Sequence, residues 1–194
     1  GSRGSELALW QANYVLSKLK KLGLDATIKV IKTKGDEIQH LSFDKMEGKG
    51  FFTKEIEEAL KRKEIDIAVH SYKDLETNNP EELVIAAVIT REEPNDILII
   101  NRSAVDPKRA LSLKEMAKVG TSSYRRKSQV LAFRKDLEVC DLRGNVPTRI
   151  QKLKDGNYDA IILAAAGINR LNLDLSGFHV EQMDPCSFIP APAQ

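Results

Sequence analysis

The sequence has 194 residues, 42% hydrophobic and 30% charged, which is enough to bury a core in one or two globular domains. Its 30 basic and 28 acidic residues give a net charge of +2, which argues against a general nucleic-acid-binding protein. The 2 cysteines suggest no disulfide framework, and we find neither a secretory leader nor an apolar run that would span a bilayer, so we expect a cytoplasmic protein.

The first half of the chain alternates helix and strand patterns. A first helix has an apolar stripe that includes Leu9 and Leu16, with Ser5 placed to cap its start and Gly23 to end it. A second helix is predicted at 54–60, after a glycine-bearing loop. Strand patterns occur at residues 26–33, 65–69 and 84–89.

The second half repeats the alternation after Pro94. Strands are predicted at residues 97–100, 118–119, 137–140 and 160–163. Helices are predicted from a capping box at 112–115, from the arginines after Gly120, from Pro147 at a first helical position, and over 164–171.

The alternation predicts an α/β fold in two lobes, each a mostly parallel sheet flanked by helices. A boundary near 91–96 divides the chain into a first lobe at 1–92 and a second lobe at 93–189. The proline-rich tail at 190–194 is expected to return to the first lobe. Binding residues of such folds lie on the loops at the carboxyl ends of the strands, and two lobes predict a cleft.

Arginines stand where two of the predicted helices begin. Arg125 and Arg126 follow Gly120-Thr121-Ser122-Ser123, and Arg143 and Arg149 flank Gly144-Asn145. The start of a helix already carries partial positive charge, so a cation there costs up to about 1 kcal/mol. An anion bound by the backbone donors, hydroxyls and guanidinium groups would offset this cost. The pattern therefore predicts a receptor for carboxylate or phosphate.

A third segment places reactive side chains directly after a strand. Ser71, Lys73 and Asp74 follow the apolar run 65–69 and bring a hydroxyl, an ammonium and a carboxylate to one strand end. Nearby cations favour the charged form of Asp74, which could stabilise a cationic intermediate or pass protons. The loop Gly48-Lys49-Gly50-Phe51-Phe52 adds a cation and aromatic surface.

Other residues favour plainer interpretations. The three histidines, His40, His70 and His179, show no metal-ligand spacing, so we expect no metal site, and His70 is interpreted as a structural residue at a strand end. The Gly48-Lys49-Gly50 run lacks the spacing of a P-loop. Arg109 and Arg134 are expected to be solvated or salt-bridged surface groups.

Six motifs in order closely resemble the hydroxymethylbilane synthase family, whose members are also called porphobilinogen deaminases. The resemblance covers nearly the whole chain. It rests on Gly1-Ser2-Arg3-Gly4-Ser5-Glu6-Leu7-Ala8-Leu9-Trp10-Gln11-Ala12, Gly48-Lys49-Gly50-Phe51-Phe52, Val69-His70-Ser71-Tyr72-Lys73-Asp74, Gly120-Thr121-Ser122-Ser123-Tyr124-Arg125-Arg126, Leu142-Arg143-Gly144-Asn145 and Asp159-Ala160-Ile161-Ile162-Leu163-Ala164.

The resemblance implies a transferase of porphyrin and heme biosynthesis that joins porphobilinogen units head to tail, releases ammonia at each step and extends a covalently held dipyrromethane. It implies a two-lobed fold like that of type II periplasmic binding proteins and Asp74 as the catalytic carboxylate. Nothing in the sequence demands more than a monomer. The implied binding residues are Arg3, Ser5, Lys49, Phe52, Ser71, Lys73, Thr121, Ser122, Ser123, Arg125, Arg126, Arg143, Gly144, Arg149 and Arg170.

The cysteine that carries the dipyrromethane belongs, in that family, to a third domain that this chain does not match. Neither Cys140 nor Cys186 has a matching context, so we assign the attachment to neither. A second functional class stays open, namely a non-catalytic two-lobed protein that binds a small polycarboxylate. Asp74 separates the two, because a pure anion receptor gains nothing from a carboxylate among its cations.

Overall fold

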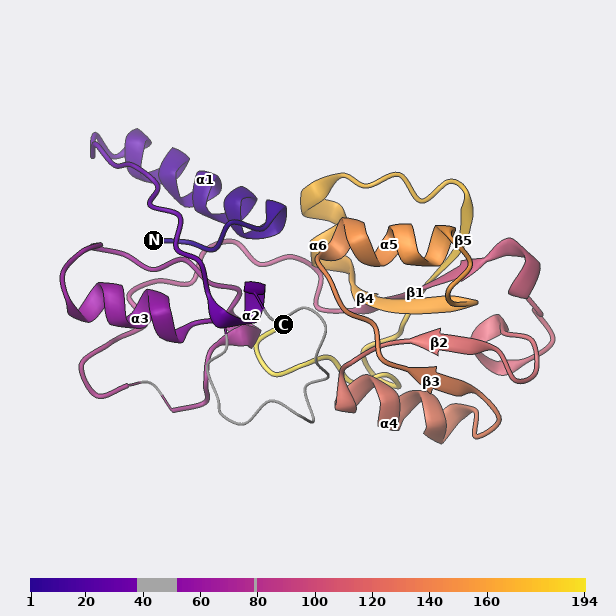
Figure 1. Ribbon diagram of the computed structural model, residues 1–194. Helices are drawn as coiled ribbons and strands as arrows, with labels where there is room; N and C mark the ends of the chain where they lie inside the picture. Colours follow the sequence, from indigo (N-terminus) through magenta and orange to yellow (C-terminus); the bar gives the residue numbers. More distant parts are fainter. Residues whose placement is uncertain (38–51, 79) are drawn as a thin grey trace. The chain divides into compact units, whose positions relative to one another are not determined.

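The computed structural model describes residues 1–37, 52–78 and 80–194, which form two compact units (Figure 1). Unit 1 comprises Gly1–Arg91 with Ala193, and unit 2 comprises Glu92–Pro192 with Gln194. Among these residues, no helix has both the length and the apolar character that a bilayer crossing requires.

Unit 1 is built on a long capped helix and two shorter ones. Helix α1 (Glu6–Lys21) starts at Ser5, whose Oγ accepts a hydrogen bond from the backbone N–H of Ala8 at 3.4 Å, as the sequence predicts. Helix α2 spans Lys34–Glu37, and helix α3 spans Lys54–Lys61. Inward residues of α3 pack with Ile65 in a small core.

The strands predicted for unit 1 do not form a regular sheet among the described residues; these are the patterns at 26–33, 65–69 and 84–89. The amino terminus makes isolated contacts instead, because Ser2 N–H donates to the Lys29 carbonyl at 3.1 Å and its own carbonyl accepts from Ile31 at 2.8 Å. Val84 is 84% exposed. Its β-branched side chain favours extended backbone, but a strand also needs a paired neighbour.

Unit 2 contains a five-stranded sheet in the order β3-β2-β4-β1-β5. The strands are β1 (Asp96–Asn101), β2 (Lys118–Gly120), β3 (Glu138–Cys140), β4 (Ala160–Ala164) and β5 (Phe178–Gln182). Strand β2 pairs in parallel with β3 and β4, whereas β1 pairs antiparallel with β4 and β5. The predicted α/β class is confirmed, and the sheet is mixed because β1 runs against its four other strands, including the unpredicted β5.

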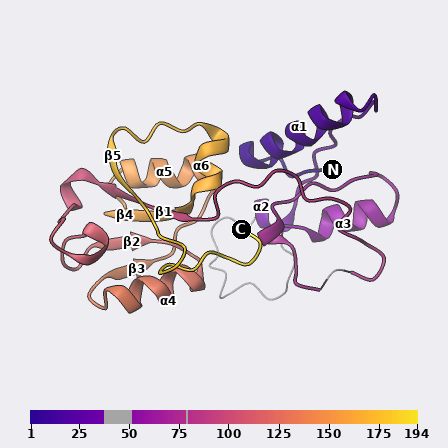
Figure 2. The ribbon, with the colours of Figure 1, turned by 180° about the vertical axis from the view of Figure 1, so that it is seen from behind.

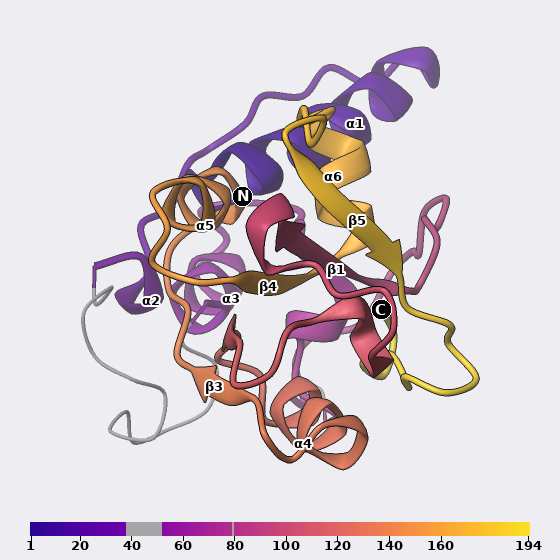
Figure 3. The same ribbon diagram turned by 90° about the vertical axis from the view of Figure 1, so that its right-hand side faces the viewer.

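Helices cover both faces of this sheet. Helix α4 (Tyr124–Phe133) lies on one face, and α5 (Val146–Lys154) and α6 (Ala165–Leu171) lie on the other (Figures 1 and 3). Alternate residues of β1 divide between the two cores, with Leu98 on the α4 side and Ile99 on the α5 and α6 side, each 0% exposed. Such full burial stabilises the fold by about 1.5–3 kcal/mol per side chain, so β1 anchors the unit.

The chain after β5 descends on the side of α4 (Figure 2). Phe188 is fully buried there, and its ring centroid lies 6.3 Å from that of Phe133 on α4. The next residue also reaches α4, since the Ile189 carbonyl accepts from the side chains of Arg125 and Gln129.

The predicted capping box at 112–115 does not begin a helix. A short 3-10 turn, Ala110–Ser112, occupies this region, and Leu111 and Ser112 adopt positive φ angles of 60° and 45°. A left-handed backbone cannot continue into an α-helix, so the sequence motif was misleading here.

The surface role predicted for Arg109 is confirmed, but that for Arg134 is wrong. Arg109 is partly exposed and pairs with Asp106 and Glu115. Arg134 is only 8% exposed; it pairs with Asp136 at 2.7 Å and donates to the carbonyls of Ala110, Leu113 and Lys114. A buried guanidinium that satisfies this many carbonyls is part of the structure of unit 2.

Candidate functional site

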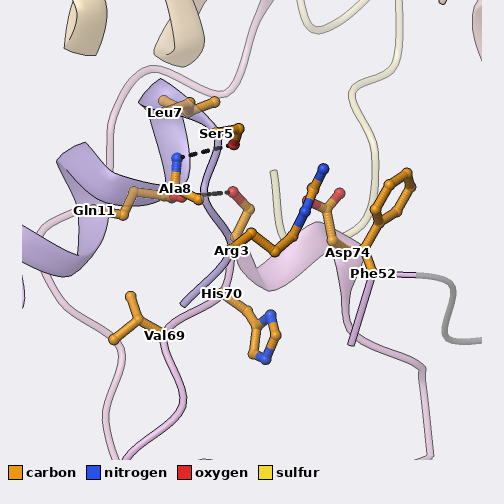
Figure 4. Close-up of a pocket in the computed structure, with 10 residues that line it drawn as sticks. Arg3, Ser5, Leu7, Ala8, Gln11, Phe52, Val69, His70 and Asp74 are labelled. Carbon is orange, nitrogen blue, oxygen red and sulfur yellow. Dashed lines mark hydrogen bonds between the residues drawn. The ribbon is translucent and has the colours of Figure 1, made fainter. Parts of the chain in front are cut away.

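Unit 1 contains a pocket that brings together several of the predicted site residues (Figure 4). It is lined by Arg3, Ser5, Leu7, Ala8, Gln11, Phe52, Val69, His70, Ser71 and Asp74. The start of α1, the segment at 69–74 and Phe52, two residues before α3, each supply part of the wall. A cation, a carboxylate and an aromatic ring thus face one small cavity.

The cation of the pocket lies against its aromatic ring. The guanidinium carbon of Arg3 is 4.1 Å from the centroid of the Phe52 ring, a cation–π contact, and its side chain extends toward Asp74 (Figure 4). On the opposite wall, Gln11 Nε2 donates to Ser71 Oγ at 3.0 Å. These contacts orient polar groups of both walls.

Asp74 lies on a 3-10 turn, Tyr72–Asp74, that starts after Ser71. Its backbone N–H donates to the Ser71 carbonyl at 2.9 Å, and its side chain is exposed. Lys73 belongs to the same turn but is not among the residues that line the pocket. Lys49, which the sequence also predicts for this site, lies outside the described residues.

His70 is a partly buried neighbour of Asp74 and Arg3. Burial chiefly lowers the pKa of its imidazole from the usual 6.5, while the Asp74 carboxylate acts to raise it and the Arg3 guanidinium to lower it. Its buried Nε2 has no hydrogen-bond partner within the described part of the chain. His70 is therefore neutral at neutral pH.

In unit 2, two predicted loops lie at the same edge of the sheet. The loop after β2 leads into α4, and the loop after β3 leads into α5; β2 and β3 are parallel neighbours. Ser122 joins the loops, since its Oγ donates to the Leu142 carbonyl at 2.9 Å and accepts from the Leu142 N–H at 3.0 Å. The parallel pairing thus places the two arginine-bearing loops side by side.

The hydroxyls of the first loop shape the start of α4. Ser123 is the N-cap, and its Oγ accepts from the Arg126 N–H at 3.4 Å. Thr121 is buried, and its Oγ1 accepts from the Ser123 N–H at 3.2 Å. The loop is therefore preorganised by its own side chains.

A buried carboxylate holds the two arginines of α4. Asp96, the first residue of β1, is 0% exposed, and its oxygens lie 2.7 Å from Arg125 Nη2 and 2.7 Å from Arg126 Nη2. Gln194 Nε2 donates to the same carboxylate at 2.9 Å. The anion predicted at this helix start is in part a carboxylate of the chain itself. Two guanidinium groups and one carboxylate still leave net positive charge.

Burial acts to raise the pKa of Asp96, but hydrogen bonds from Arg126, Gln194 and Arg125 and the positive charge of Arg126 outweigh it. Its pKa therefore lies below the usual 3.8. Asp96 is ionised at neutral pH and is closed to water, so it acts through its partners rather than as an acid or base.

The second loop depends on an unusual glycine. Gly144 has a φ of +111°, and Asn145 caps α5 by accepting from the Thr148 N–H at 2.9 Å. Arg149 Nε donates to the Gly144 carbonyl at 2.7 Å. Burial lowers the pKa of Arg143, which the nearby Asp141 partly offsets.

Arg170 lies in the last turn of α6, so it does not share the loops that hold the other predicted arginines. The described residues contain no cluster of three His, Cys, Asp or Glu side chains that could hold a metal ion. Both cysteines are free thiols, and Cys140 lies beside Glu138.

Comparison with known proteins identifies the family. The family model described as "Porphobilinogen deaminase, dipyromethane cofactor binding domain" matches residues 1–194. The chain belongs to the porphobilinogen deaminase family. It is 46% identical over 193 residues to the porphobilinogen deaminase of Nitratiruptor sp., and 48% identical over 194 residues to the probable porphobilinogen deaminase of Methanocella arvoryzae.

These porphobilinogen deaminases are longer than this chain. The alignments cover all of it but only 61% and 62% of the two relatives. Among solved structures, an amino acid substrate-binding protein of Streptococcus pneumoniae bound to L-arginine has a TM-score of 0.42 and 15% identity, covering 88% of this chain and 62% of its own. That likeness is too weak to support a functional comparison.

The cofactor named for the porphobilinogen deaminase domain fits the donors of unit 2. Dipyrromethane is built from pyrroles with acetate and propionate side chains, so it needs cations and N–H donors. The start of α4 supplies both, and Arg125, whose side chain is 22% exposed, is the cation there that a ligand can reach. Arg143 adds a further cation on the neighbouring loop.

Two residues of these sites escape sequence reasoning. Asp96 begins an apolar strand, and Gln11 lies on the buried side of α1. An acidic residue at the start of the run Ile97–Ile100 was the available signal, because a buried carboxylate needs a cationic partner. Gln11 gave no signal, since its partner Ser71 is distant in the sequence.

Proposed function

We propose that the protein is a hydroxymethylbilane synthase, which condenses porphobilinogen units head to tail with release of ammonia. The observation that supports it most is the pocket of unit 1, where Asp74 lies with Arg3 and Phe52 in a chain of the porphobilinogen deaminase family. The proposal includes a cytoplasmic monomer and an attachment cysteine in a third domain, in keeping with the greater length of the relatives.

Asp74 would act on the leaving amine. When the carbon–nitrogen bond of the protonated aminomethyl group breaks, its electron pair leaves with ammonia and the positive charge passes to the pyrrole that remains. The Asp74 carboxylate within the pocket would stabilise that charge as it develops on the pyrrole. Arg3 would bind a carboxylate of the same substrate, and Phe52 offers a flat surface to a pyrrole ring.

The loops of unit 2 would hold the acidic side chains of the growing pyrrole chain. Arg125, Arg143 and Arg149 supply charge there, while Thr121, Ser122 and Ser123 fix the backbone. When bound, dipyrromethane supplies the pyrrole carbon that accepts the first substrate unit. The remaining proposed binding residues are Ser5, Ser71, Lys73, Gly144, Arg126, Arg170 and Lys49.

The competing function is that of a non-catalytic receptor for a polycarboxylate. Its cations would be the same, but its pocket would have no use for a carboxylate. The exposed Asp74 inside a pocket that also contains Arg3 favours the enzyme, because a fixed negative charge weakens the binding of anions.

Replacement of Asp74 by Asn in the complete protein tests the proposal. The amide keeps the shape of the side chain but removes its charge, so ammonia release from porphobilinogen should fall by about 100-fold or more. The dipyrromethane should stay attached, as measured by intact mass. Asp66→Asn is the matched control, since Asp66 is also an exposed aspartate of unit 1 but does not line the pocket.

The control should release ammonia at the rate of the unchanged protein. Normal ammonia release by Asp74→Asn would show that Asp74 is not catalytic. If the protein without any substitution binds porphobilinogen but releases no ammonia, the result would favour the non-catalytic receptor instead.

A further inference from the structure

Asp96, Arg125 and Arg126 form a cluster whose three side chains differ in their exposure to solvent, and this difference decides which of them can bind an anion. The Asp96 side chain is 0% exposed, that of Arg126 9% and that of Arg125 22%. The carboxylate is therefore closed to a ligand, Arg126 is nearly closed, and Arg125 is the member of the cluster that water and solutes can reach.

Each guanidinium of the cluster is fixed by two bonds at its outer nitrogens. Arg125 donates from Nη2 to Asp96 and from Nη1 to the Ile189 carbonyl at 2.5 Å. Arg126 donates from Nη2 to Asp96 and from Nη1 to the Ile162 carbonyl at 3.1 Å. A guanidinium has five N–H donors, so both groups are held rigidly while other donors remain for an acceptor.

Asp96 also makes this arrangement electrostatically tolerable. Two adjacent cations at a helix start repel each other and meet the positive end of the helix dipole. One buried carboxylate removes part of that repulsion without taking up all of the positive charge. A rigid cationic site with unused donors binds a carboxylate at low entropic cost.

We propose that Asp96 is a positioning residue for carboxylate binding in unit 2: it fixes the guanidinium groups of Arg125 and Arg126 so that Arg125 can bind an acidic side chain of the pyrrole chain. The proposal rests on the proposed function. Asp96 touches no substrate; it acts through the arginines, and Arg125, as the exposed one, makes the contact.

The test compares Asp96→Asn with Asp136→Asn in the complete protein. Asp136 pairs with Arg134 at 2.7 Å, so its variant also breaks a carboxylate–arginine pair of unit 2 but at the other end of α4. Four quantities are measured: dipyrromethane occupancy by intact mass after the apoprotein is incubated with porphobilinogen, KM for porphobilinogen, kcat, and the thermal midpoint.

Both variants should lower the thermal midpoint. Only Asp96→Asn should also lower dipyrromethane occupancy and raise KM about tenfold or more, because displaced guanidinium groups lose their alignment with the ligand. Asp136→Asn should keep the occupancy and KM of the unchanged protein. Normal occupancy and KM in folded Asp96→Asn would overturn the proposal and leave Asp96 a purely structural residue.

If Asp96→Asn does not fold, Asp96→Glu tests the proposal instead, because this variant keeps the charge but moves the carboxylate by one methylene. A folded Asp96→Glu with KM raised severalfold supports the proposal, and one with unchanged KM and occupancy overturns it. Failure of the proposed function is distinguishable, since the unchanged protein would then neither carry dipyrromethane nor release ammonia. That result would overturn both proposals.

Discussion

At the scale of single residues, exposure separates two aspartates with different predicted roles. Asp74 is exposed at a pocket, where a carboxylate can meet a substrate. Asp96 is fully buried and bonded to two arginines, where it can only hold other groups in place. The type of residue does not distinguish these roles, but its access to water does.

His70 provides a pH-dependent test of the pocket. Its folded-state pKa is lowered below 6.5, chiefly by burial. As the pH falls toward and below 6.5, the unfolded chain therefore binds more protons than the folded chain does. Stability should therefore rise with pH in this window and be lost on acidification. We expect the thermal midpoint of the 194-residue chain to decrease as the pH is lowered from 7.5 to about 5.5. The decrease should be smaller in His70→Asn.

Above about pH 7.5 the thermal midpoints of the unchanged protein and of His70→Asn should vary with pH in parallel, because the imidazole is then neutral in both the folded and the unfolded state. Equal slopes for the unchanged protein and His70→Asn below about pH 6.5 would contradict the burial of a neutral His70.

At the scale of elements, the loop before α5 depends on the backbone of Gly144. Its φ of +111° is strained for any other residue, and an added Cβ would lie 2.8 Å from the Thr148 side chain. Gly156 has a φ of +77° with nothing within 4 Å of an added Cβ, so it is the matched control.

We expect Gly144→Ala to lower the free energy of unfolding by about 1–3 kcal/mol, through backbone strain and the clash with Thr148. Gly156→Ala should cost about 1 kcal/mol, from backbone strain alone. Denaturant unfolding of both variants measures the difference. A smaller loss for Gly144→Ala than for Gly156→Ala would mean that the loop adapts, which conflicts with a preorganised binding loop.

The elements best predicted from the sequence are those with strong local signals. Ser5 and α1, the loop–helix junction at Ser123, and Pro147 at the start of α5 all agree with the structure. The capping box at 112–115 failed because left-handed residues stop the chain from turning into a helix.

What the sequence could not predict depends on distant contacts. The direction of β1 within the sheet follows from its pairing with β4 and β5, which lie more than fifty residues further along the chain. The partners of Arg125 and Arg126 come from β1, from β4 and from Ile189. Local patterns indicate that an anion is needed at α4, but only the tertiary fold shows that Asp96 supplies part of it.

At the scale of the whole molecule, the core is unequally developed in the described residues. Unit 2 has an extensive core on each face of its sheet, whereas the core of unit 1 gathers around Ile56, Ala59 and Ile65. The curated relatives are longer, since this chain covers 61% of the Nitratiruptor protein. Tests of activity therefore require the complete polypeptide.

The intact mass of the complete protein during incubation with porphobilinogen tests the proposed function most directly. We predict that the purified protein carries the mass of a dipyrromethane and that further species then appear, each heavier by one porphobilinogen less one ammonia. A protein whose mass shows no dipyrromethane and does not change with porphobilinogen would contradict the proposal that this fold extends a covalently held chain of pyrroles.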